Sequence, residues 1–155
     1  MQQQPGYLKG LRMVHLALMA SQCMVLGVVF YLVIQKHLPP VEKSVDKILQ
    51  VAALLVAFGA GYTAAASFKG KIAAMLSTPL SLAEKASQYH SASIIQWAIL
   101  EGACLFVISC FLIAGNYAFA AMAIVLMVYF ALLAPSRIKI VMQLKLTDKE
   151  VDTLQ

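Results

Sequence analysis

The residue of this chain best suited to chemistry is Glu101, the only acidic residue inside any of its long apolar stretches. It lies roughly 10 Å along a helix from Ile94, where its own apolar stretch begins. A charged carboxylate is costly in hydrocarbon, so the neutral, protonated acid is expected at such a position unless a cation pairs with it. This placement predicts a site that binds a proton or a sodium ion. The alternative is a hydrogen-bonded acid that only ties helices together.

Other polar side chains are expected at the depth of Glu101. Counting inward from the end of each apolar stretch places them within a few ångström of one another along the membrane normal. They are Ser21 and Gln22 in the first stretch, Tyr62 and Thr63 in the second, and Tyr129 in the fourth. We therefore expect Tyr62, Thr63, Gln22 and Tyr129 to join Glu101 in ion binding. His15 lies nearer the headgroups and is expected to be interfacial.

Small residues recur at intervals of four along the second apolar stretch. Such ladders allow helix backbones to approach closely, which indicates a packing face. The third stretch has small residues on both sides of its acid. The predicted packing residues are Ala53, Ala57, Gly61 and Ala65, together with Ala98 and Gly102. The face would pack within one subunit or between subunits.

The composition of the chain explains why these residues should lie in a membrane. Of its 155 residues, 61% are hydrophobic and only 12% are charged. A soluble domain carries roughly 25% charged residues. We therefore predict an all-α, four-span transmembrane helical bundle that forms a single domain over residues 1–155. The predicted spans are about 13–34, 48–67, 94–114 and 117–134.

The distribution of charge predicts an orientation. Four spans bring both termini to one side of the membrane, and nine of the twelve Lys and Arg residues fall on that side. The positive-inside rule then places both termini and the middle loop in the cytoplasm, as in a bacterial inner membrane protein. The net charge of +5 suits attraction to an anionic lipid bilayer. Nucleic acid is not an expected partner, because the basic residues form no stripe with interleaved aromatics.

Helix-end signals predict a long cytoplasmic hairpin between the second and third spans. Ser81 and Glu84 form a capping box directly after Thr78–Pro79, so the third helix should begin near Leu82. The second helix can continue to Leu76, which leaves a tip at 77–81. At the other membrane face, residues 115–116 are expected to form a tight turn. The tail 146–155 carries a second possible capping box at 147–150.

The segment around Glu101 also resembles a known family. Residues 98–107, with the sequence AILEGACLFV, are similar to the carboxylate-bearing helix of the proteolipid family, the c subunits of rotary ATP synthases and their vacuolar relatives. Gly59–Ala60–Gly61, residues 64–66 and Pro79 resemble that family's small-residue helix and polar loop. The resemblance covers residues 59–114. It implies that Glu101 is an ion-binding carboxylate and that 77–79 lie in the loop.

The sequence carries none of the signatures of a catalytic or metal centre. It has no His/Cys/Asp cluster at metal-ligand spacing, no P-loop and no Ser/His/Asp arrangement, so we expect no enzyme activity, no catalytic residues, no cofactor and no metal. One hypothesis is an ion-handling subunit of a homo- or hetero-oligomer, built around Glu101. The other is a structural or assembly subunit of a membrane complex, which docks a partner through residues 77–88 and the tail. The first requires the carboxyl of Glu101, and the second should tolerate glutamine there.

The charge distribution leads to a test of topology. A reporter that is active on one side of the membrane only, fused after Gln155 or inserted between Pro40 and Glu42, should give opposite results at the two positions. Equal activity at both positions would contradict the four-span arrangement.

Overall fold

The computed structural model describes residues 7–35 and 41–144, which form five helices and no strand. The predicted all-α class is therefore confirmed for this part of the chain. The second predicted capping box, at 147–150, lies outside the described residues. The helices are α1 (Tyr7–Ile34), α2 (Lys43–Ser77), α3 (Leu82–Ala114), α4 (Tyr117–Leu132) and α5 (Arg137–Leu144).

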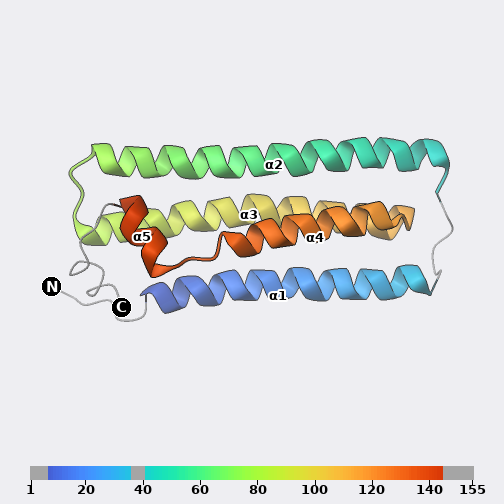
Figure 1. Ribbon diagram of the computed structural model, residues 1–155, viewed down its shortest axis with the longest axis horizontal. Coiled ribbons are helices and arrows are strands. Elements are labelled where there is room, and N and C mark those ends of the chain that lie inside the picture. The colour runs from blue at the N-terminus through green and yellow to red at the C-terminus, as the bar shows by residue number, and fades with distance from the viewer. Residues whose placement is uncertain (1–6, 36–40, 145–155) are drawn as a thin grey trace.

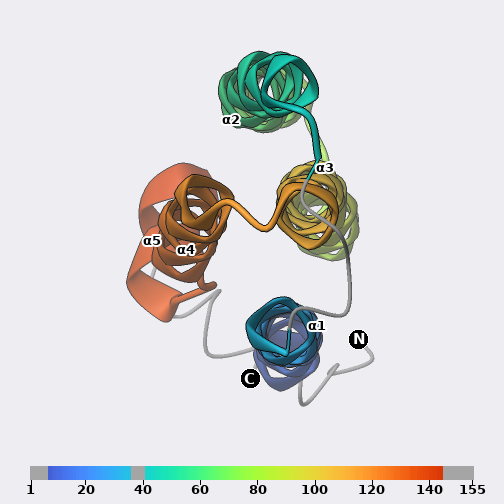
Figure 2. The ribbon, with the colours of Figure 1, turned by 90° about the vertical axis from the view of Figure 1, so that its right-hand side faces the viewer.

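Four of the helices run side by side, and α3 is the central one (Figure 1). Seen end on, α3 lies between α1 and α2, with α4 beside it (Figure 2). The short helix α5 crosses the end of the bundle at which the α2–α3 hairpin closes, and it contacts α2 there. We call this end the tip end, and the end with the α3–α4 connection the turn end.

The lengths of the helices bear on the number of membrane spans. Three of the described helices, α1, α2 and α3, are long and apolar enough to cross a membrane. The chain is thus compatible with a multi-pass membrane protein. Helix α4 is also apolar but has 16 residues, which is a length of about 24 Å against a hydrocarbon core of about 30 Å. A fourth span through α4 stays a prediction.

The predicted helix ends near the tip are confirmed. The Ser81 hydroxyl accepts a hydrogen bond from the Glu84 backbone N–H, and the Glu84 carboxylate accepts one from the Ser81 N–H at 2.9 Å. The Ser81 hydroxyl also donates to that carboxylate at 2.7 Å. The hydrogen bond from the Ser81 hydroxyl lowers the pKa of the Glu84 carboxyl most, and the bond from the Ser81 backbone N–H lowers it further. Glu84 lies before the apolar part of α3. Helix α2 ends at Ser77, because the residue before Pro79 is extended.

The predicted turn between the third and fourth apolar stretches is also present. Gly115 ends α3 in the left-handed conformation with φ +65° and donates its N–H to the Phe111 carbonyl. Glycine adopts that conformation without a Cβ penalty. Asn116 caps α4 by accepting the Ala118 N–H.

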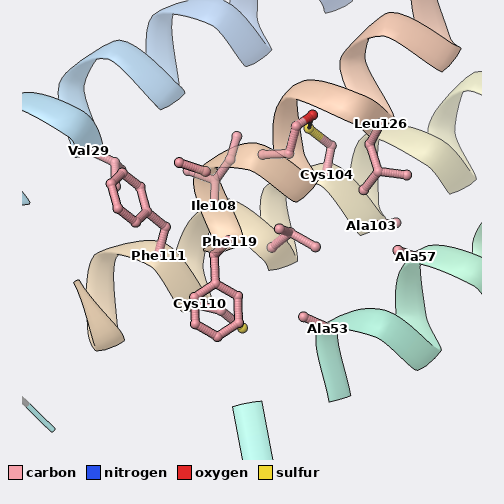
Figure 3. Packing of buried hydrophobic residues seen from close by; sticks show 13 residues of the cluster. Val29, Ala53, Ala57, Ala103, Cys104, Ile108, Cys110, Phe111, Phe119 and Leu126 are labelled. Atoms are coloured by element: carbon pink, nitrogen blue, oxygen red, sulfur yellow. Dashed lines mark hydrogen bonds between the residues drawn. The ribbon is translucent and has the colours of Figure 1, made fainter. Parts of the chain in front are cut away.

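Two hydrophobic clusters hold the helices together. The tip cluster joins residues of α1 to α5 around Trp97 and Phe130. The turn cluster joins α1 to α4 around Phe111 and Phe119, and Figure 3 shows Ala53 and Ala57 of α2 entering it. The α3 chain passes from one cluster to the other between Leu100 and Ala103.

The small-residue ladder is buried in its first half only. Ala53 and Ala57 are buried, whereas Gly61 and Ala65 are half-buried and the buried face of α2 continues through Ala64 instead. A step of four residues turns about 40° around a helix, so a strict four-residue ladder leaves a straight interface within a few steps. A Cβ added at Gly61 would meet no atom within 4 Å.

The other two predicted packing residues lie on an open face of α3. Ala98 and Gly102 are exposed. A Cβ added at Gly102, as at Gly61, would meet nothing within 4 Å. Packing at these positions would therefore need a second chain.

The packing of α2 leads to a test of stability. Ala53→Leu forces a larger side chain into a fully buried position and should lower the free energy of unfolding in detergent by about 1 to 3 kcal/mol. Ala66→Leu, on the exposed side of the same helix, is the matched control. Gly61→Leu should be as mild as this control. A loss at Gly61 that equals the loss at Ala53 would contradict the observed packing.

Candidate functional site

Glu101 of α3 is paired with α1. Its carboxyl oxygen Oε1 lies 3.1 Å from the Ser21 hydroxyl, and the same hydroxyl lies 2.8 Å from the Leu18 carbonyl oxygen. The pairing brings together two of the polar residues predicted at one depth. No ion pair to Glu101 is found among the described residues, and no Lys or Arg lies between residues 13 and 34 of α1.

The Ser21 hydroxyl has one proton and lies within hydrogen-bonding distance of two acceptors. A hydroxyl carries a single proton, whereas both the Leu18 carbonyl and the Glu101 carboxyl lie within hydrogen-bonding distance. If Glu101 is ionised, the Ser21 proton must serve both acceptors or leave the Leu18 carbonyl. If Glu101 is protonated, its own O–H donates to Ser21, and Ser21 donates to Leu18. In the second arrangement each of the two hydroxyl protons has an acceptor of its own.

Gln22, the neighbour of Ser21, points into the bundle. It is fully buried, and neither its amide nitrogen nor its amide oxygen has a hydrogen-bond partner. On α1, Leu18 packs against the tip cluster and Val25 against the turn cluster. Gln22 therefore occupies the level between the two clusters, as Glu101 does on α3. Leaving a buried polar group unsatisfied costs about 1 to 3 kcal/mol.

The remaining residues of the predicted layer face in other directions. Tyr62 is 76% exposed. Thr63 is exposed and donates to its own helix, at the Gly59 carbonyl. Tyr129 is half-buried and lines a cavity at the tip end. No hydrogen bond within residues 7–35 and 41–144 joins these three residues or Gln22 to Glu101, because equal depth does not fix rotation about a helix axis.

His15 is more buried than its sequence position indicates. It is 2% exposed and packs between two aromatic rings, with centroid distances of 4.6 Å to Phe130 and 4.9 Å to Trp97. Its Nε2–H donates to the Phe130 carbonyl at 3.1 Å. The sequence does contain a signal for this burial. Leu11, His15, Leu18 and Gln22 alternate at spacings of four and three residues, which marks the inward face of α1.

A polar cluster at the turn end was also missed from the sequence. The Asn116 amide donates to both carboxylate oxygens of Asp46, at 3.0 and 3.2 Å, and the Gln50 amide donates to one of them at 2.9 Å. These bonds fasten the start of α4 to the start of α2. Residues 46 and 116 lie far apart in sequence, so no local pattern predicts their contact.

Comparisons with protein-family models, with curated proteins and with solved structures give no match to this chain. No group of three or more His, Cys, Asp or Glu residues that could hold a metal ion occurs in the described part of the chain. The resemblance to the proteolipid family and the role of Glu101 thus rest on the residues themselves.

The buried amide of Gln22 leads to a test of how much an unsatisfied polar group between the two clusters lowers stability. Gln22→Leu removes two unsatisfied polar atoms at similar volume and should raise the free energy of unfolding in detergent by about 1 to 3 kcal/mol. Gln88→Leu, at an exposed position of α3, should change it little. A loss of stability in Gln22→Leu would show that the amide has a partner, such as a bound water.

Proposed function

We propose that this chain is a small, non-enzymatic membrane subunit that handles protons, with Glu101 as the group that takes up and releases them. The observation that carries the proposal is the shared hydroxyl of Ser21, which lies between the Leu18 carbonyl and the Glu101 carboxyl. With a protonated Glu101 each hydroxyl proton has its own acceptor, whereas with an ionised Glu101 the Leu18 carbonyl and the carboxylate share the Ser21 proton. The hydrocarbon region of a membrane favours the same neutral form.

The surroundings of Glu101 favour a proton over a sodium ion. Hard cations are bound by several oxygen ligands, whereas one side-chain oxygen, that of Ser21, lies within hydrogen-bonding distance of the carboxyl among the described residues. No hydrogen bond in the described part of the chain joins Tyr62, Thr63 or Tyr129 to Glu101. A proton needs a single acceptor and a hydrogen-bonded neighbour, which the pair of Glu101 and Ser21 supplies.

Release of the proton would be coupled to α1. When Glu101 ionises, the Ser21 hydroxyl is the nearest donor, and its rotation toward the carboxylate gives up the bond to the Leu18 carbonyl. Serine bonds to preceding helix carbonyls are local and easily exchanged. The protonation state of Glu101 on α3 would thus decide whether the bond from Ser21 to the Leu18 carbonyl is present in α1.

The position of Glu101 suits exchange with a neighbour in an oligomer. The side chain is half-buried, and the adjacent Ala98 and Gly102 are exposed. In this proposal the exposed small residues let another subunit approach the carboxyl, as the resemblance to the proteolipid family implies. Four spans in a bacterial inner membrane, with both termini cytoplasmic, belong to the same proposal.

A hydrophobic carbodiimide gives a direct test, because it reacts with protonated carboxyls in apolar surroundings. It should label Glu101 in preference to the six other acidic residues, and labelling should fall as the pH rises. Glu101→Gln should abolish the labelling, whereas Glu84→Gln, outside the apolar stretches, should leave it unchanged.

Labelling that follows the exposed acids, or that is indifferent to pH between about 6 and 9, would contradict a proton site in an apolar setting. The structural or assembly role would then be favoured. Its docking surface would be the exposed hairpin tip around Ser77 and Pro79 together with the tail.

A further inference from the structure

A second site candidate is an open cavity of about 510 Å³ at the tip end, lined by residues of α2, α3, α4 and α5. Its volume lies within the range of small-molecule sites. The floor and walls are largely apolar and include Phe68, Ile72, Trp97 and Leu133. The proton proposal uses none of these four side chains.

All the charged residues that line this cavity are basic. Lys69 and Lys139 line it, and none of its lining residues is acidic. The Lys139 ammonium donates to the Leu132 and Ala134 carbonyls, at 2.6 and 3.1 Å, which leaves its third proton available. An anionic group at this place would meet two cations and no acidic side chain among the described residues that line the cavity.

Gln96 adds an unused hydrogen-bonding group inside the cavity. Its side chain is 7% exposed and lines the cavity, and its amide has no hydrogen-bond partner within the described part of the chain. Its neighbours, by contrast, are satisfied: the Tyr89 hydroxyl donates to Gln143 at 3.0 Å, and the Ser93 hydroxyl donates to the Tyr89 carbonyl. The Gln96 amide atoms are not among the fully buried unsatisfied atoms of the described residues, so they are accessible from the cavity and can hydrogen-bond a polar group bound there.

The cavity also lies across the predicted membrane boundary. The second apolar stretch ends at 67 and the third begins at 94, so Lys69 and Tyr89 fall on the headgroup side, whereas Ala65 and Gln96 fall on the hydrocarbon side. The lysines are therefore at headgroup level, and Ala65 and Trp97 are at acyl-chain level. This division matches the shape of a phospholipid.

We propose that the cavity binds one anionic phospholipid of the leaflet on the tip side. Its phosphate interacts with Lys69 and Lys139, and an ester carbonyl accepts a hydrogen bond from the Gln96 amide. The first part of an acyl chain packs against Trp97 and Leu133. Charge complementarity selects a lipid with net negative charge over a zwitterionic one.

The chain contains its own reporter for this site, because Trp97 is its single tryptophan and lines the cavity. The full chain in detergent would be titrated with phosphatidylglycerol brominated on its acyl chains, and quenching of Trp97 fluorescence would be followed. Brominated phosphatidylcholine with the same chains is the comparison. Phosphatidylglycerol should reach half-quenching at a roughly tenfold lower concentration, as expected for charge-assisted binding.

Variants separate this site from general attraction to anionic lipid. Lys69→Gln and Gln96→Leu should each weaken the binding of phosphatidylglycerol by roughly fivefold to tenfold. Lys71→Gln makes the same charge change on the same helix at a residue that does not line the cavity, and it should leave binding unchanged.

Three outcomes would overturn the proposal. The first is equal quenching by the two lipids. The second is an equal loss of binding in Lys69→Gln and Lys71→Gln. The third is displacement of the brominated lipid by inorganic phosphate at equal concentration, which would show that the cavity binds a free anion.

Discussion

The structure depends on the packing of α1, α2 and α4 around α3. Helices in lipid gain little from the hydrophobic effect, so their association comes from close packing and a few polar contacts. Helix α3 has more buried residues than any other described helix, and it contributes to both hydrophobic clusters. Its rotation is thereby fixed at both ends, and with it the direction in which Glu101 points.

Between the two clusters the packing is polar instead of apolar. Leu100 belongs to the tip cluster and Ala103 to the turn cluster, and Glu101 follows the first directly. Gln22 and Ser21 occupy the corresponding level of α1. A carboxyl, a hydroxyl and an unsatisfied amide at one level reduce stability, and proteins retain such groups where they serve a function. The level between the clusters is therefore where the proton proposal is centred.

The sequence predicted those features that depend on local chemistry. The capping box at Ser81 and the turn at Gly115 follow from residue types and spacings a few positions apart, and both are present. The all-α class follows from composition in the same way. The pairing of Ser21 with Glu101 was anticipated only as a similarity in depth.

Features that depend on helix rotation or on contacts between distant segments could not be predicted from local sequence patterns. Tyr62 shares the predicted depth of Glu101 but is largely exposed. Gly61 belongs to a regular ladder, yet that ladder turns away from the interface. The contact of Asn116 with Asp46 and the packing of α5 across the tip end join segments that no sequence spacing relates.

The central claim is that Glu101 is a protonated carboxyl that donates its proton to Ser21. Infrared spectroscopy of the membrane-reconstituted protein at neutral pH tests it most directly, because a protonated carboxyl has a carbonyl stretching band that carboxylates lack. The account predicts such a band, its disappearance in Glu101→Gln, and its shift to higher frequency in Ser21→Ala, where a hydrogen bond is lost. A spectrum at neutral pH without this band, or with one that Glu101→Gln leaves in place, would contradict the account.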